Sequence, residues 1–353
     1  MDVPKLNANL LKVARFFSSR KIDLRPHIKT HKSPQIAKMQ IEAGAIGITV
    51  ATLAEAEAMI ESGIDNIFIA YPTVGQANLK KLAKILSYSK KIILAVDSIF
   101  HLEQLARIPF AEFPLQLRIE INSGQNRCGL RPEKGEMEPI MEFLKIHGHL
   151  FSIEGVFTHA GHAYRCASPE QIEEVASSEQ AAVLKAAQIL RSDGFACKTT
   201  STGSTPTAFF TGSAEINECR PGNYVFFDAM QVANKTAMID ECAFTVISTV
   251  IATYSDRLII DAGSKALGLD KGAHGQSLLN SFGLIKGHPH LSIAALSEEH
   301  GIINFKSGEK VPAPGEIVEI IPNHSCAAAN LFSHYHVFRE NRLVETWPLV
   351  GRR

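Results

Sequence analysis

The stretch Arg25–Lys32 reads RPHIKTHK and lies where the sequence changes from strand-like to helical residues. Pro26 argues against a helix before Lys29, because proline lacks an amide hydrogen and its ring clashes inside a helix. The dipeptide Ser33-Pro34 has the N-cap hydroxyl and the fixed φ that are typical of a helix start. We therefore predict a strand over Ile22–Ile28, followed by a helix. A lysine between them can reach a site at the carboxyl end of the strand; the alternative is a basic turn that faces solvent.

The same alternation continues along the chain. Strand-like runs are predicted at Ile22–Ile28, Ala45–Ala51, Asn66–Tyr71, Lys91–Asp97, Leu115–Ile121, Ile153–His159, Lys198–Gly203 and Ile216–Val225. Helical spacing of apolar residues lies between most of them, for example at Leu53–Glu61, Ala77–Ser87 and Pro169–Arg191. Eight such units predict a (β/α)8 TIM barrel of the α/β class. An open doubly wound sheet is the alternative, because the number of strands alone does not prove closure.

The pattern changes at about Thr245, where short strand-like runs are separated by turn residues. These runs are Val246–Tyr254, Arg257–Ile260, Glu316–Ile321 and Tyr335–Arg339. They predict a smaller C-terminal all-β domain. We place the barrel at residues 18–235 and the β domain at residues 1–17 plus 236–353.

The composition excludes several classes of protein. Lysine plus arginine (36) balances aspartate plus glutamate (36) in 353 residues, which argues against a protein held to nucleic acid or a membrane surface by bulk charge. Apolar runs such as Ile92–Val96 are too short to cross a bilayer. The start of the chain lacks a secretory signal, and the six cysteines have no paired spacing. We expect a cytoplasmic protein that acts on a small molecule.

Residues with useful chemistry follow the predicted strands, where barrel active sites are built. Lys29 follows the first strand, His159 ends the sixth, and the seventh runs into Gly203–Thr205. The amides and hydroxyls of Gly203–Thr205 suit a phosphate group, in a loop that often binds phosphate in such barrels. Taken alone, this segment is also an ordinary helix N-cap.

A phosphate site opposite a lysine that can form a Schiff base indicates pyridoxal 5′-phosphate. The sequence contains neither a Walker motif nor a dinucleotide-binding glycine motif that competes for the phosphate. Lys29 is preferred to Lys32 because it continues the inward alternation of the strand. Lys32 borders the next helix and is predicted to be a solvated charge.

A second cluster, Pro322–Asn330, follows the predicted strand Glu316–Ile321. In an extended chain His324 and Cys326 face the same side, so imidazole and thiolate can bind one ion. Nitrogen and sulfur ligands favour Zn²⁺ over Mn²⁺ or Mg²⁺. Two protein ligands leave positions open for water and substrate, although most His-x-Cys pairs bind no ion.

Five motifs occur in the order in which they stand in one known family: Arg25–Lys32, Gly203–Thr207, Arg220–Tyr224, Ser297–Gly301 and Pro322–Cys326. With them the chain resembles the D-threonine aldolase and D-serine dehydratase group, fold-type III pyridoxal phosphate enzymes related to alanine racemase. The resemblance covers nearly the whole chain and implies the alanine racemase type of barrel. One departure is that Met1 stands almost at the expected helix Asn7–Phe17, so we expect either a truncated N-terminal strand or a start that is placed too late.

The resemblance also implies a role for each matching residue. Lys29 matches the Schiff-base lysine, His159 the imidazole that packs on the cofactor ring, and Arg127 an arginine that reaches the cofactor. The phosphate-binding residues are Gly203, Ser204, Thr205, Gly222 and Asn223, and the metal ligands are His324 and Cys326. His162 is expected as a catalytic base and Tyr164 as a contact on the cofactor and substrate side, with ordinary loop packing as the alternative for both.

These roles imply a lyase that acts on β-hydroxy D-amino acids. A cysteine as second ligand resembles the zinc dehydratases, whereas an aspartate is typical of the manganese or magnesium aldolases. We therefore expect dehydration of D-serine or 3-hydroxy-D-aspartate to a keto acid and ammonia. The alternatives are retro-aldol cleavage to glycine and an aldehyde, then racemisation or non-catalytic cofactor binding. Relatives form dimers, so a homodimer is expected.

Overall fold

The computed structural model describes residues 1–108, 114–272 and 279–352, and the chain divides into two compact units. The first, called the barrel unit, comprises Leu11–Ala163, Glu170–Gly222 and Val350–Arg353. The second, called the β unit, comprises Met1–Leu10, Tyr164–Pro169 and Asn223–Leu349. The domain limits at residues 18 and 235 stay a prediction.

The barrel unit is built on an eight-stranded parallel sheet in the order β1-β8-β7-β6-β5-β4-β3-β2. Its strands are β1 (Asp23–Leu24), β2 (Ile48–Val50), β3 (Ile67–Ile69), β4 (Ile92–Val96), β5 (Leu115–Ile121), β6 (Phe151–Thr158), β7 (Thr199–Thr202) and β8 (Glu218–Cys219). The two ends of this order are joined, because Ile46 N donates to Leu24 O (2.9 Å) and Thr49 N donates to Pro26 O (2.8 Å). The predicted TIM barrel is thereby confirmed.

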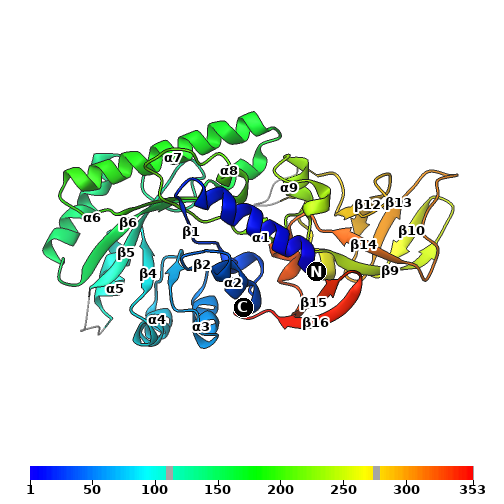
Figure 1. Cartoon of the computed structure of the whole chain (residues 1–353), viewed down its shortest axis with the longest axis horizontal. Coiled ribbons are helices and arrows are strands. Elements are labelled where there is room, and N and C mark those ends of the chain that lie inside the picture. Colours follow the sequence, from blue (N-terminus) through cyan, green and yellow to red (C-terminus); the bar gives the residue numbers. More distant parts are fainter. Residues whose placement is uncertain (109–113, 273–278, 353) are drawn as a thin grey trace. The chain divides into compact units, whose positions relative to one another are not determined.

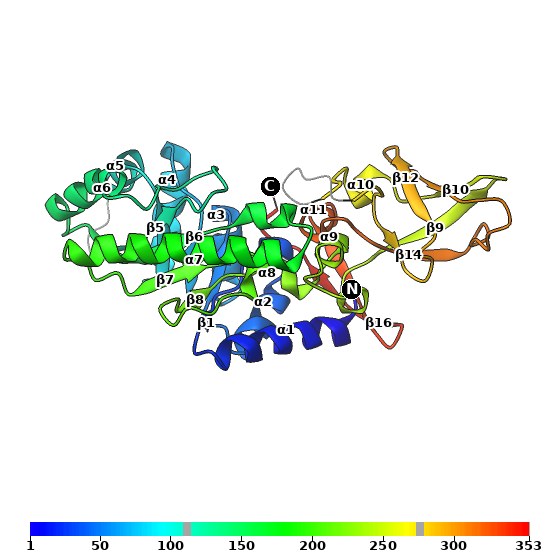
Figure 2. The ribbon, with the colours of Figure 1, turned by 90° about the horizontal axis from the view of Figure 1, so that it is seen from above.

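Helices cover the outer side of these strands (Figure 1). They are α2 (Pro34–Glu42), α3 (Leu53–Glu61), α4 (Gln76–Tyr88), α5 (Ile99–Ala106), α6 (Lys134–Ile146), α7 (Pro169–Ser192) and α8 (Thr205–Ala208), while α1 (Val3–Ser18) has residues in both units. Fully buried strand residues such as Ile67 and Val156 pack with helix residues such as Met59 and Val183. Each aliphatic side chain buried in this way stabilises the fold by about 1.5–3 kcal/mol. Figure 2 shows α7 lying along the β6 and β7 side.

The first strand is shorter than predicted. The helix-like segment η1 (Ile28–Thr30) replaces its last predicted residue, because Pro26 has no amide hydrogen and the chain turns after His27. Lys29 therefore lies on this turn, so the expectation that strand alternation directs it inward was wrong.

The β unit contains a closed antiparallel barrel in the order β10-β13-β12-β11-β14-β9 and a separate two-stranded sheet β15-β16. Its strands are β9 (Val246–Thr253), β10 (Arg257–Ile260), β11 (Leu284–Ile285), β12 (Ser292–Leu296), β13 (Gly301–Asn304), β14 (Ile317–Ile321), β15 (His334–Arg339) and β16 (Arg342–Pro348). Short helical segments of this unit are η3 (Asn223–Val225), α9 (Ala229–Ala233), η4 (Ile239–Glu241), α10 (Ser264–Leu267) and α11 (Ser325–Ala329), while η2 (Gly161–Arg165) has residues in both units. The predicted all-β domain is confirmed, but β11, β12, β13 and β16 were not predicted.

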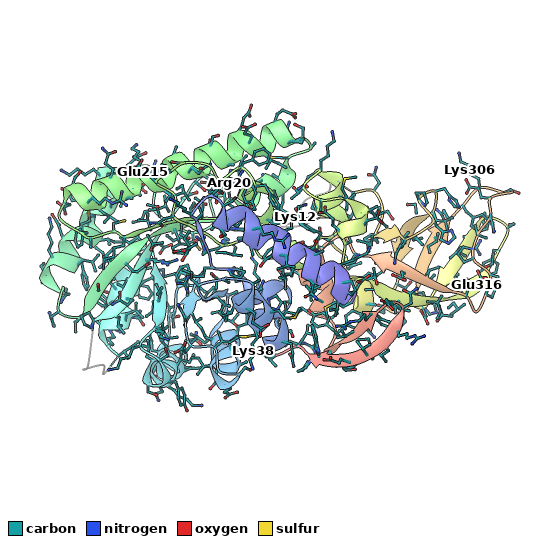
Figure 3. The ribbon with its side chains drawn as sticks, in the orientation of Figure 1. Lys12, Arg20, Lys38, Glu215, Lys306 and Glu316 are labelled. Atoms are coloured by element: carbon teal, nitrogen blue, oxygen red, sulfur yellow. The ribbon has the colours of Figure 1, made fainter. Side chains whose placement is uncertain are left out.

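The surface agrees with the balanced composition. Charged side chains of both signs, such as Lys38, Glu215 and Lys306, are exposed (Figure 3). Among the helices of the described residues, none is long and apolar enough to cross a membrane.

Candidate active site

The turn that carries Lys29 is held by His27. The His27 Nδ1 accepts the backbone N–H of Lys29 at 3.3 Å and caps η1. Burial lowers the pKa of His27 well below its usual value, and the positive charges of Lys29, His159, Arg220 and Arg127 lower it further. The ring of His27 is therefore neutral at pH 7, and the predicted site residues Lys29, His159 and Arg127 are near enough to act on its pKa.

Lys32 has a different environment. Its Nζ lies 2.5 Å from Glu55 Oε1 and donates to Gly351 O at 3.3 Å, while Glu55 is buried and also accepts the Ala51 N–H. The prediction that Lys32 is a solvated charge was wrong. It is a half-buried structural ion pair, which leaves Lys29 as the lysine of the η1 turn.

Two loops of the site share one buried carboxylate. Glu179 Oε1, on α7, accepts the N–H groups of Ala160 (3.2 Å) and Gly203 (3.0 Å), and burial raises the pKa of Glu179. On the other side of the Gly203 peptide, the carbonyl oxygen bonds to His159 Nδ1 at 2.9 Å. The predicted cofactor residues His159 and Gly203 are thus brought together. Sequence reasoning missed Glu179, although an acidic residue on an apolar helix face, between Ala176 and Val183, was a usable signal.

The loop after β7 fits a phosphate group. Ser204 and Thr207 cap α8 reciprocally, whereas the buried hydroxyl of Thr205 has no hydrogen-bond partner among the described residues. Buried hydroxyls normally find a partner, so the unpartnered Thr205 hydroxyl beside Gly203 indicates a polar ligand. Gly203 has φ +141°, and a Cβ there would lie 2.6 Å from Arg220 N.

The loop after β8 is equally tight. A Cβ on Gly222 would lie 2.8 Å from His27 O. Only glycine lets the two backbones approach this closely. Gly203, Ser204, Thr205 and Gly222 are therefore suited to a phosphate that is bound by backbone and hydroxyl groups.

Arg220 was predicted only as part of the Arg220–Tyr224 motif, with no role of its own. In the structure it links the ends of β6, β7 and β8. Its guanidinium donates to Thr202 O at 3.1 Å and bonds to Ser201 Oγ and Thr158 O. Burial lowers the pKa of Arg220 to about 10, although Glu218 opposes this effect. Arg220 therefore remains a cation at neutral pH beside His27.

The barrel unit also contains a buried ion network centred on Glu218. Glu218 accepts from Arg118 Nη2 (2.9 Å), Arg25 Nε (2.8 Å) and Ser201 Oγ (2.6 Å). Burial alone would raise the pKa of Glu218, but Arg118 and Arg25 hold it well below its usual range. The carboxylate therefore stays ionised and organises strands β1, β5 and β8.

The loop after β5 carries Arg127. Its Nη2 lies 3.6 Å from Oε1 of Glu120, whose pKa is raised by burial and lowered in part by Arg127. A Cβ on Gly124 in this loop would lie 3.4 Å from His162 Nε2. His162 therefore borders the loop that carries Arg127.

Asp97, Glu120 and Cys128 also bring oxygen and sulfur atoms within 4.8 Å of one another. Asp97 is paired with His101 at 2.8 Å, and Glu120 with Arg127. Both carboxylates already face cationic groups, so we assign this cluster to ion pairing.

In the β unit, His324 and Cys326 interact directly. The structure gives a hydrogen bond between their side chains. The backbone is extended only at His324, the N-cap of α11, and Cys326 already lies within that helix, so the expectation of an extended chain across both residues was wrong. Burial alone would lower the pKa of His324, but Cys326 and Asp228 raise it to about 10. Imidazole and thiol in contact are a fitting donor pair for Zn²⁺.

Two predicted cofactor residues belong to the β unit. The Tyr164 ring lies 6.4 Å from the His324 ring in an edge-on arrangement. The Asn223 amide donates to Asp228 Oδ2 (2.6 Å) and Ser325 Oγ (3.1 Å), and its nitrogen lies 3.9 Å from Cys326 Sγ. The side chain of Asn223 therefore contacts Asp228, Ser325 and Cys326, and its predicted phosphate contact stays a prediction. Asp228 was not predicted.

Comparison with known proteins connects these features. The model of the alanine racemase N-terminal domain matches residues 1–230, and that of the "Putative serine dehydratase domain" matches residues 243–338. The chain is 30% identical to D-serine dehydratase of Dictyostelium discoideum, over 96% of this chain and 92% of that protein.

Solved structures agree with this assignment. D-threo-3-hydroxyaspartate dehydratase from Delftia sp. HT23 superposes with a TM-score of 0.89 at 29% identity, covering 99% of this chain and 95% of that one. D-threonine aldolase from Filomicrobium marinum gives a TM-score of 0.89 at 26% identity, covering 100% and 94%. The dehydratase has also been solved as a cysteine-to-alanine mutant in the metal-free form. The chain therefore belongs to the alanine racemase-like family that contains D-serine dehydratase and D-threonine aldolase.

Proposed function

We propose that this protein is a lyase that depends on pyridoxal 5′-phosphate and a divalent metal and acts on β-hydroxy D-amino acids. Dehydration of D-serine or 3-hydroxy-D-aspartate is the preferred reaction. The observation that carries the proposal is that one chain has both a lysine turn with phosphate-fitting loops and a contacting imidazole–thiol pair. Relatives that span almost the whole chain are named as dehydratases of these substrates.

The barrel unit supplies the residues that would hold the cofactor. Lys29 would bind it covalently, the Gly203–Thr205 loop and Gly222 would hold its phosphate, and Arg127 and His159 would contact its ring. When bound, pyridoxal phosphate stabilises negative charge at the substrate Cα. Lys29 is the base that removes the Cα proton, and His27 fixes the turn from which it acts.

The β unit supplies the residues that would hold the ion. His324 and Cys326 are the proposed ligands, and the thiolate favours Zn²⁺ over Mn²⁺ or Mg²⁺. A bound ion acts as a Lewis acid on the β-hydroxyl group. Water is lost on elimination and taken up again on hydrolysis, so D-serine gives pyruvate and ammonia. The metal-free cysteine mutant of the related dehydratase supports a cysteine ligand.

Retro-aldol cleavage is the second candidate. The related D-threonine aldolase superposes as well as the dehydratase does, so the fold does not separate the two reactions. In that case His162 would take the proton of the β-hydroxyl group, and glycine and an aldehyde would form.

The test is product analysis. We expect the loaded protein to convert D-serine or 3-hydroxy-D-aspartate to equal amounts of keto acid and ammonia. A chelator should abolish this activity and added Zn²⁺ should restore it, because the ion assists departure of the hydroxyl group. Glycine plus aldehyde from D-threonine would instead establish the aldolase. Absence of both product pairs would refute the lyase.

We also propose a cytoplasmic homodimer. The family resemblance supports the dimer, and the absence of a disulfide among the six cysteines, all of which lie in described residues, fits a reducing compartment. Light scattering should give twice the 38.6 kDa mass of the chain. A particle of one chain mass at micromolar concentration would contradict the dimer.

A further inference from the structure

A fully buried carboxylate stands beside the proposed metal ligands. Asp228 Oδ2 accepts hydrogen bonds from Asn223 Nδ2 (2.6 Å), the Ser325 backbone N–H (2.9 Å) and His324 Nδ1 (3.3 Å). Its other oxygen, Oδ1, accepts the Gln231 N–H (3.1 Å) and so caps α9. The two oxygens have separate tasks, since Oδ1 faces α9 and Oδ2 faces the His324–Cys326 segment.

The bond to His324 determines which ring nitrogen can hold an ion. An ionised carboxylate only accepts hydrogen bonds, so Nδ1 of His324 carries the hydrogen. Nε2 is then the ligand nitrogen, and the ring is held in one orientation. A carboxylate behind a metal-binding histidine is a recurring arrangement that fixes the tautomer and raises ligand basicity.

Asp228 also acts on the second ligand. The Ser325 N–H that it accepts lies in the backbone between His324 and Cys326. The Asn223 amide that it orients lies 3.9 Å from Cys326 Sγ. The Asp228 carboxylate therefore constrains the His324 imidazole directly. It constrains the Cys326 thiol through the Ser325 backbone and the Asn223 amide.

We infer that Asp228 is the positioning residue for a divalent ion held by His324 and Cys326. The inference rests on the proposed metal-dependent function, and it adds a residue that does not itself bind the ion. Loss of such a carboxylate typically weakens metal binding by about 10–100-fold.

Two variants separate positioning from folding. Asp228→Asn keeps the size of the side chain and one acceptor oxygen, but its amide cannot satisfy both sets of donors. Asp228→Ser keeps a hydroxyl that can cap α9 and removes the arm that faces His324. The matched control is Asp261→Asn, because Asp261 Oδ1 accepts from Ser248 Oγ and the Thr249 N–H, both at 2.7 Å, in the same unit.

The experiment measures metal affinity directly. Full-length protein loaded with cofactor is stripped of metal and titrated with Zn²⁺ against a competing chelator, and with Co²⁺, whose thiolate absorption band reports Cys326. Circular dichroism and melting of the metal-free proteins establish that each variant is folded. We expect about 10–100-fold weaker Zn²⁺ binding in both Asp228 variants and unchanged binding in Asp261→Asn.

The outcomes distinguish this inference from the proposed function. Wild-type affinity in folded Asp228→Ser or Asp228→Asn would overturn the positioning role and leave the metal-dependent function intact. Equal losses in Asp261→Asn would assign the effect to general destabilisation and also overturn it. Wild-type protein that binds no Zn²⁺ would refute the metal-dependent function itself.

Discussion

At the scale of single residues, Glu179 joins the loops that carry His159 and Gly203. Glu179→Ala would leave two buried backbone N–H groups without their acceptor, at a cost of about 1–3 kcal/mol each. We expect lower stability in urea and weaker binding of pyridoxal phosphate, measured by equilibrium titration of the apoprotein. Glu179→Gln keeps the acceptor oxygen and should restore most of the binding.

The control for this prediction is Asn217, which contacts the start of β7, whereas Gly203 follows the end of β7. Asn217 Oδ1 accepts the Thr200 N–H at 3.0 Å, and its amide donates to Lys198 O at 2.7 Å. Asn217→Ala should reduce stability and leave cofactor affinity unchanged. Cofactor affinity that stays at the wild-type value in Glu179→Ala would show that Glu179 does not shape the site.

The surroundings of some residues could be predicted from the sequence, whereas those of others could not. The turn that carries Lys29 was predictable because Pro26 and Ser33-Pro34 are local signals for the change from strand to helix. Asp228 was not, since it meets His324 across 96 positions and belongs to no motif. The environment of Lys32 was predicted wrongly for the same reason, because its partners Glu55 and Gly351 are distant in sequence.

At the scale of elements, the loop between β7 and α8 depends on Gly203. Gly203→Ala would place a methyl group 2.6 Å from Arg220 N in a backbone that already has φ +141°. We expect a loss of stability of at least about 1–3 kcal/mol and loss of pyridoxal phosphate binding. Differential scanning fluorimetry with and without the cofactor measures both effects.

Gly194→Ala is the matched control, because Gly194 has φ +91° but no atom within 4 Å of an added Cβ. Gly194→Ala therefore introduces the strain of a positive φ but no steric clash with neighbouring atoms. If the two variants bound the cofactor equally, the close approach of Gly203 to Arg220 would have no role in the site.

Some helices and strands are easier to predict from the sequence than others. Helix α3 was predicted with its observed limits, Leu53–Glu61, because its periodicity is local. Strand β11 comprises only Leu284–Ile285 and is defined by its partners β12 and β14, so no local pattern indicates it. The barrel strands were recognisable because helices separate them at regular intervals, while short hairpin strands depend on contacts across the sheet.

At the scale of the whole molecule, the barrel depends on the buried network of Glu218 with Arg25 and Arg118. The folded-state pKa of Glu218 lies below its unfolded value of about 4.3, so the unfolded chain binds its proton first. The stabilisation is therefore present above that pH and is lost as the pH falls through the folded-state pKa. Below about pH 4.3 this group steepens the loss by up to about 1.4 kcal/mol per pH unit.

Glu218→Gln removes this contribution and leaves two buried arginines without their carboxylate. We expect it to be less stable at neutral pH by about 3–5 kcal/mol and less sensitive to acid than the wild type. Urea unfolding over a series of pH values measures both. Parallel curves for the two proteins below about pH 4.3 would show that Glu218 does not carry the acid sensitivity.

The central claim is that Lys29 binds pyridoxal phosphate. Borohydride reduction of the loaded full-length protein, followed by peptide mass mapping, tests it most directly because reduction makes the linkage permanent. We predict a pyridoxyl label on Lys29 and its loss in Lys29→Ala, with Lys32 unlabelled in both proteins. A label on Lys32, or no lysine label in the wild type, would contradict the account.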